Sequence, residues 1–223
     1  NAVEEGLLRD AFVGQDPTYK VLVPIVNPRT QQGLLELAAA NASANTENGS
    51  VEIVALNVLQ VAGDTQQNVE ADRLDHQREL LEASRSIAEK MDVPVQTRAV
   101  VGQDVGETIL EIIESEGADH ALLGWRGSFG QGEYAFGPNI DSLLMESPVD
   151  VTLANFQEQP IDDVIALVGD GPNTLTAVRR AAEFATLSDK AERPTLVNVQ
   201  PTDVAAGSDA TEHGGTAMEQ GEE

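Results

Sequence analysis

The sequence predicts an α/β protein with a doubly wound, five-stranded parallel sheet, followed by an additional partial strand-helix-strand repeat. From residue 19 onward, short apolar runs alternate with segments of helical periodicity, which is typical of parallel strands joined by crossover helices. The first run, residues 19–26, is apolar throughout its centre, as expected for a strand that helices cover on both faces. A chain of 223 residues is also long enough to bury a substantial core.

Five strands and four crossover helices are expected before residue 155. The strands are expected at residues 19–26, 51–61, 93–101, 120–124 and 149–154. The helices are expected at residues 30–44, 69–91, 104–117 and 139–146. In the third helix, Asp104 is the expected N-cap, and Glu107 three residues later completes a capping-box pattern.

The pattern of the main domain, residues 19–155, restarts in residues 156–200. A strand at 163–172, a helix at 174–187 and a strand at 195–199 repeat the opening strand, helix and strand, which predicts a partial second unit. A coincidental repeat of the same elements is the alternative. Residues 201–223 are acidic and almost without apolar side chains, so we expect a disordered tail.

Residues 1–18 are expected to form an amphipathic connector. Apolar side chains recur there at helical spacing: Ala2, Val3, Leu7, Leu8, Ala11 and Phe12. Because the chain does not begin with methionine, we favour a segment that arrives from a preceding domain. The alternative is a helix packed on the surface of the main domain.

The composition excludes several classes of function. A net charge of −25, from 38 acidic and 13 basic residues, argues against nucleic-acid binding, which needs a basic surface. Three lysines against ten arginines indicate a halophilic source, with an ordinary acidic mesophilic protein as the alternative. The chain has no cysteine and no apolar stretch long enough to span a membrane, which predicts a cytoplasmic location.

Residues suited to catalysis are few, so we do not expect an enzyme. The three histidines, His76, His120 and His213, have no spacing that indicates a metal site, and structural or solvated roles are expected for them. The sequence context of a catalytic nucleophile is also lacking at Ser128, Ser142 and Ser147.

A glycine-rich loop follows the fourth expected strand. Gly124, Gly127 and Gly137 are separated by two and then nine residues, and a helix is expected after them. Ligands of open parallel sheets bind beyond the carboxyl ends of the strands, where glycines and helix amides can hold an anion. By itself, the pattern is equally typical of a flexible surface loop.

Three features of the main domain occur together: this glycine series, the Val-Leu-Val-Pro of residues 21–24, and Gly102 with Ile109. In these features, the main domain resembles a universal stress protein domain. The resemblance implies a strand order of 3-2-1-4-5 and a homodimer formed through the fifth strand. It also implies that the glycine series holds the phosphates of ATP or AMP. The candidate binding residues are Val26, Asn27, Gly102, Gly124, Arg126, Gly127, Gly137 and Asn139.

Two residues depart from the pattern of the nucleotide-binding members. Val26 stands where those members carry an acidic residue, and Pro138 stands where their glycine series continues with serine or threonine. Asn139 could cap the following helix or contact an anion, and Arg126 could supply positive charge, although a solvated arginine is the alternative. ATP or AMP binding is therefore weakened and the pocket is degenerate, although Asp170 of the second unit matches the acidic position.

We expect a cytoplasmic regulatory domain of an amino-acid transporter. Two segments are similar to the carboxyl-terminal cytosolic regions of haloarchaeal cationic amino-acid permeases. They are the Val-Pro-Ile-Val-Asn-Pro of residues 23–28 and the Phe-Gly-Pro-Asn-Ile-Asp of residues 136–141. That similarity implies a fused N-terminal membrane transporter domain and a position at the inner face of the membrane. The alternatives are a stand-alone universal stress protein that binds ATP or AMP, and a purely structural dimerisation domain.

Overall fold

The computed structural model describes residues 18–60, 67–125, 136–156, 161, 163–188 and 193–198. It divides the chain into two compact units, Asn1–Phe156 and Gln157–Glu223, and each is described by itself. The predicted connector and acidic tail lie outside the described residues, apart from Thr18.

The first unit contains the predicted five-stranded parallel sheet, in the order β3-β2-β1-β4-β5. Leu22 of β1 is aligned with Val54 of β2 on one side and with Ala121 of β4 on the other. The fold class and the strand order are therefore confirmed. The strands are β1 (Tyr19–Pro24), β2 (Val51–Gln60), β3 (Val95–Gly102), β4 (His120–Gly124) and β5 (Asp150–Ala154).

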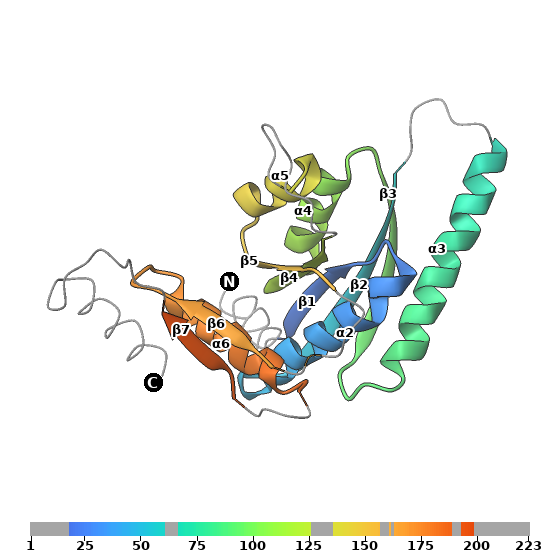
Figure 1. Ribbon diagram of the computed structural model, residues 1–223. Helices are drawn as coiled ribbons and strands as arrows, with labels where there is room; N and C mark the ends of the chain where they lie inside the picture. The colour runs from blue at the N-terminus through green and yellow to red at the C-terminus, as the bar shows by residue number, and fades with distance from the viewer. Residues whose placement is uncertain are drawn as a thin grey trace, which may run out of the picture. The chain divides into compact units, whose positions relative to one another are not determined.

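Helices cover both faces of this sheet (Figure 1). The chain moves in one direction from β1 to β3 and in the opposite direction from β3 to β5, so right-handed crossovers place the first two helices on one face and the next two on the other. A short 3₁₀ helix, Thr46–Asn48, precedes β2. The four α-helices are α2 (Pro28–Ser43), α3 (Gln67–Ala88), α4 (Val105–Glu116) and α5 (Pro138–Glu146).

The core of the first unit lies on both faces of β1 and β2. Because successive side chains of a strand point to opposite faces, the fully buried Val21, Leu22 and Val23 alternate between the two helix layers. On the α4 and α5 face, Leu22 belongs to a buried cluster with residues of both helices. That cluster comprises Leu22, Val54, Leu56, Ile109, Ile113, Ala118, Ala121, Leu123 and Leu143.

Helix α3 ends at Ala88, three residues earlier than expected, and prolines account for three other differences between the expected and observed boundaries. Helix α2 begins at Pro28, two residues earlier than expected, because Asn27 caps it and the fixed φ of proline suits the first helical position. Helix α5 likewise begins at Pro138. Strand β3 begins at Val95, two residues later than expected, because the preceding Pro94 has no N–H for the ladder.

The second unit is a strand-helix-strand fragment, as the sequence predicts: β6 (Ile165–Val168), α6 (Thr174–Ala185) and the parallel strand β7 (Thr195–Asn198). Strand β6 is shorter than expected because the following Gly-Asp-Gly leads into a turn before α6. Ala166 and Val168 are buried in a small cluster with α6, whereas Ile165 and Leu167 are 62% and 70% exposed.

One side-chain hydrogen bond repeats in the two units. Asn57 of β2 donates through Nδ2 to the carbonyl oxygen of Ile25, directly after β1, at 2.7 Å. Asn198 of β7 donates in the same way to the carbonyl oxygen of Val168, at the end of β6, at 2.9 Å. In each unit, therefore, an asparagine on the second strand is hydrogen-bonded to the end of the first strand.

Among the described residues, no helix has the length and apolar character needed to cross a membrane.

Candidate functional site

The candidate site lies beyond the carboxyl ends of β1 and β4. The order of the strands reverses between these two neighbours, and in open α/β sheets this is where a crevice forms that accepts ligands. Most of the predicted binding residues lie in the described part of the chain, but Arg126 and Gly127 lie outside it. The middle of the glycine series is therefore not described.

The segment after β1 contains an apolar side chain and an asparagine side chain that already accepts a hydrogen bond. The amide N of Ile25 still donates to Leu56, at 2.7 Å, so the sheet pairing extends one residue past β1. Val26 is then 72% exposed. The side-chain oxygen of Asn27 accepts from the backbone N of Arg29, at 3.2 Å, as the N-cap of α2. Of the two predicted binding residues, one lacks a polar group and the other caps a helix.

The end of β4 is closely packed. A Cβ atom at Gly124 would lie 3.2 Å from Cδ1 of Leu34 in α2, so only glycine leaves that approach undisturbed. The next residue, Trp125, donates its backbone N–H to Ala154 of β5 at 2.7 Å. Its ring meets that of Phe136 edge to face, with 5.1 Å between the ring centroids. This aromatic contact joins the two residues that flank the undescribed part of the loop.

The first turns of α4 contact the carboxyl end of β3 on one side and the start of α5 on the other. A Cβ atom at Gly102 would overlap Oγ1 of Thr108 in α4, and a Cβ atom at Gly106 would lie 3.2 Å from the carbonyl oxygen of Asn139. The predicted N-cap of α4 is confirmed, since Asp104 accepts from the backbone N of Glu107 at 2.9 Å. The structure thus places Gly102 and Asn139 around the same turn.

The first residues of α5 hold a carboxylate that the sequence analysis did not select. Oδ2 of Asp141 accepts from the backbone N–H groups of Phe136, at 3.2 Å, and Gly137, at 3.1 Å. Gly137 is the N-cap and has a φ of 104°, a conformation that favours glycine. Asn139 is therefore not the cap, which was one of the two roles considered for it. An acidic residue four positions after the last glycine was the available signal for Asp141.

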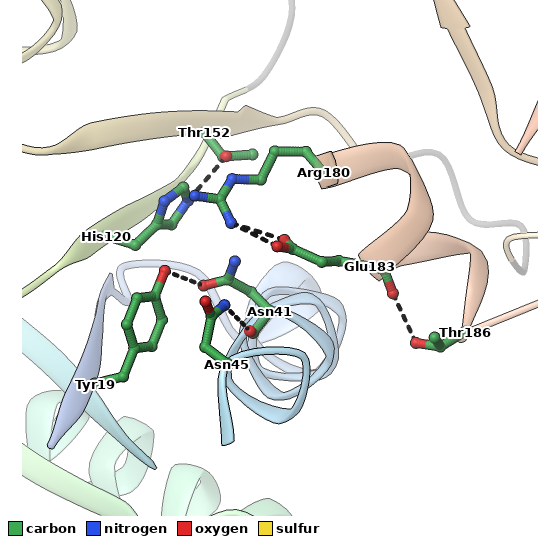
Figure 2. A network of polar contacts seen from close by, with 8 residues as sticks. All are labelled: Tyr19, Asn41, Asn45, His120, Thr152, Arg180, Glu183 and Thr186. Atoms are coloured by element: carbon green, nitrogen blue, oxygen red, sulfur yellow. Dashed lines mark hydrogen bonds and ion pairs between the residues drawn. The ribbon is translucent and has the colours of Figure 1, made fainter. Parts of the chain in front are cut away.

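No group of three or more His, Asp or Glu side chains in the described part of the chain could hold a metal ion. His120 is buried at the start of β4, so it lies at the amino-terminal ends of the strands, whereas the site lies beyond their carboxyl ends. Its Nε2 lies 2.9 Å from Oγ1 of Thr152 (Figure 2). The structural role expected for His120 therefore fits its position. His213 and the side chain of His76 lie outside the description.

The other polar contacts in Figure 2 stabilise elements within each unit. In the first unit, Tyr19 donates to Oδ1 of Asn41 in α2 at 3.3 Å, which links the start of β1 to that helix. In the second unit, Nη1 of Arg180 lies 2.9 and 2.7 Å from the two carboxylate oxygens of Glu183 on the same helix. The contact of Tyr19 lies at the start of β1, away from the carboxyl end of that strand.

Comparisons with solved structures find universal stress proteins of low sequence identity. The chain is similar to universal stress protein UspA from Lactobacillus plantarum, with 16% identity, a TM-score of 0.48, and coverage of 63% of this chain and 98% of the other. It is similar to a universal stress protein from Archaeoglobus fulgidus in complex with dAMP, with 13% identity, a TM-score of 0.45, and coverage of 62% and 98%. An AMP-bound family member from Arabidopsis thaliana gives 14% identity, a TM-score of 0.43, and coverage of 63% and 93%.

The comparison with curated proteins finds no match. The sequence model of the universal stress protein family matches residues 18–155, which is more than half of the chain and includes all five strands of the first sheet. The chain belongs to the universal stress protein family.

Proposed function

We propose that this universal stress protein domain is a cytoplasmic regulatory module of an amino-acid transporter, without catalytic activity of its own and with a degenerate nucleotide-type pocket. The transporter assignment rests on the similarity of residues 23–28 and 136–141 to the cytosolic regions of amino-acid permeases. The degenerate pocket rests on the segment after β1. There Val26 is 72% exposed and apolar, and the side chain of Asn27 caps α2. A ligand at the end of β1 finds no carboxylate on these two residues with which to bind a hydroxyl or amino group.

The backbone features of a ligand crevice are nevertheless retained, which favours a binding function over a purely structural one. Gly102 and Gly124 permit close approaches of α4 and α2 to the strand ends, and Gly137 keeps a positive φ at the start of α5. The same features support the second candidate, a stand-alone protein that binds ATP or AMP.

The proposal includes a homodimer formed through β5, which is the last strand in the order of the sheet. Sedimentation velocity tests whether the protein is a dimer in solution.

Isothermal titration calorimetry with ATP and AMP separates the two candidate functions. We expect weak or no binding to the unmodified protein, and a gain of about tenfold in affinity in Val26→Asp, since a hydrogen bond to a charged group contributes about 1.5–3 kcal/mol. Val26→Asn, which adds a polar group without the charge, is the matched control. Tight ATP binding by the unmodified protein, lost in Gly137→Ala, would favour the stand-alone nucleotide-binding protein instead.

The regulatory role requires the parent polypeptide. We expect the coding sequence upstream of Asn1 to encode membrane-spanning helices, and we expect deletion of this domain to change the rate of amino-acid uptake into proteoliposomes. The matched control deletes only residues 201–223. A coding sequence without membrane-spanning segments, or an unchanged uptake rate after deletion of the domain, would contradict the proposal.

A further inference from the structure

The second unit repeats the two opening strands of the first unit in the same register. Asn57 on β2 donates to the carbonyl oxygen of Ile25, and Asn198 on β7 donates to the carbonyl oxygen of Val168. In both units, this bond joins residues at the same position of the parallel pair. The two bonds therefore define which residues of β6 and β7 correspond to which residues of β1 and β2.

One face of β6 and β7 corresponds to a face that helices cover in the first unit. Counted back from the two hydrogen bonds, Ile165 takes the place of Leu22, and Val197 takes the place of Leu56. Leu22 and Leu56 are fully buried in the cluster on the α4 and α5 face. Ile165, in contrast, is 62% exposed, and Leu167, aligned with Val197, is 70% exposed. We call Ile165, Leu167 and Val197 the open face.

The opposite face of the same two strands already has its cover. Ala166 and Val168 point to that face and are buried with Ala181 of α6. Among the described residues of the second unit, α6 is the only α-helix. Parallel sheets are as a rule covered on both faces. In the described part of the second unit, the open face therefore lacks the helical cover that the corresponding face of the first unit has.

The first unit shows which kind of element fits such a face. Ile109 and Ile113 of α4 lie four residues apart, so they form one stripe of the helix, and both are buried against the sheet. Leu143 of α5 belongs to the same cluster. Residues 199–223, which follow β7, contain no isoleucine, leucine or phenylalanine and cannot supply such a stripe. The open face therefore fits an amphipathic helix from another polypeptide.

Size and charge favour a partner helix over a second copy of this chain. A stable interface between two globular proteins uses about 20–30 residues a side, whereas a docked helix is held by a few aliphatic anchors at i and i+4 spacing. The open face has only three aliphatic side chains, which suits the second case. The net charge of −25 also opposes self-association and attracts a helix with a basic outer side.

We propose that the open face of the second unit is a docking site for an amphipathic helix of a partner protein, with aliphatic side chains at i and i+4 spacing and a basic outer side. The site is formed by β6 and β7. It depends neither on the pocket of the first unit nor on the assignment to a transporter, so its test is independent of the tests of the proposed function.

The test uses the full chain and a fluorescently labelled peptide based on α4. The peptide comprises residues 103–117, with Glu107→Lys and Glu114→Lys on the exposed side of the helix. A lactam bridge between positions 107 and 111 keeps it helical, which circular dichroism verifies. Fluorescence anisotropy measures its binding. The control peptide carries Ile109→Ser and Ile113→Ser, which remove the aliphatic anchors without changing the charge.

We expect the α4 peptide to bind saturably, with a dissociation constant below about 1 mM, and the control peptide not to bind. Leu167→Thr should weaken binding about tenfold, because the docked helix removes much of the exposed apolar surface of Leu167 from water. Leu175→Thr is the matched control, since Leu175 is 58% exposed but lies on α6, and it should leave binding unchanged.

Three results of this titration would overturn the proposal. They are no saturable binding of the α4 peptide, equal binding of the two peptides, and an equal effect of Leu167→Thr and Leu175→Thr. The melting temperature of Leu167→Thr should match that of the unmodified protein, because threonine suits a strand and the replaced side chain is exposed. A clearly lower melting temperature would show that another part of the chain covers the face, which also overturns the proposal.

Sedimentation velocity distinguishes a second copy from a partner helix. We expect Leu167→Thr to sediment like the unmodified protein at the same concentration, since a homodimer formed through β5 does not involve β6. Loss of a dimer in Leu167→Thr, but not in Leu175→Thr, would show that the open face binds a second copy. That result would overturn the proposal.

Discussion

Replacement of Gly102 by alanine should destabilise the first unit, because the added Cβ atom has no room. It would overlap Oγ1 of Thr108 and lie 3.1 and 3.2 Å from the Cβ and Cγ2 atoms of that residue. Thr108 cannot turn away without cost, since a threonine on a helix has few rotamers and its Oγ1 donates to the carbonyl oxygen of Asp104 at 2.6 Å. The substitution therefore forces crowding and the loss of that hydrogen bond.

The expected size of the effect follows from three contributions. Overpacking costs about 1–3 kcal/mol and a lost hydrogen bond costs about 1 kcal/mol, while alanine restricts the unfolded chain and returns about 0.4–1 kcal/mol. The free energy of unfolding should fall by about 1–3 kcal/mol. For a protein of this size, that corresponds to a melting temperature lower by about 3–10 °C.

Unfolding is followed by the fluorescence of Trp125, the only tryptophan, which reports on the first unit. Gly124→Ala is the matched control, because the only tight neighbour of its Cβ atom would be Cδ1 of Leu34 at 3.2 Å, the flexible end of a side chain, and the change should cost under about 1 kcal/mol. In the double variant Gly102→Ala with Thr108→Ala, the loss should be smaller than the sum of the single losses by about 1 kcal/mol. Equal stability of the two glycine variants, or strict additivity, would refute the reasoning.

Two further predictions concern contacts that hold helices to the sheet or to each other. The amide Nε2 of the buried Gln31 in α2 donates to Oγ of Ser84 in α3 at 2.6 Å, so Gln31→Leu alone should cost about 1–3 kcal/mol, and adding Ser84→Ala should recover part of it in urea unfolding. Strictly additive losses would contradict this coupling. Glu116 of α4 pairs with Lys20 at 3.5 Å and with Arg98 at 2.8 Å, so Glu116→Gln should cost about 1 kcal/mol at low salt and less at high salt. A loss that does not depend on salt would show that the ion pairs contribute little.

The elements of this fold are readable from the sequence because their signals are local. The apolar run that contains Val21 to Val23 can be stable only if both of its faces are covered, and this requirement predicts a central strand without knowledge of its neighbours. Asp104 is likewise predicted as a cap because the amide it accepts from is three residues away. Where prediction and structure differ, as at Pro28 and Pro94, the effect of proline on the boundary is also local.

The strand order has a different origin. Alternating strands and helices predict a parallel sheet, but they are compatible with several orders, and the order 3-2-1-4-5 came from the resemblance to the family. The alignment of β1 between β2 and β4 depends on contacts between residues about 30 and 100 positions apart in the chain. No local pattern contains that information.

The candidate site shows the same division. The glycine spacing and the departures at Val26 and Pro138 were visible in the sequence and predicted a degenerate pocket. Only the tertiary structure places the carboxylate of Asp141 against the amides of Phe136 and Gly137, and the carbonyl of Asn139 against Gly106. The physical reason is that a hydrogen bond or a close approach depends on where two backbones are held in space. That position is decided by the packing of α4 and α5 on the sheet, whereas periodicity and caps are decided within a few residues.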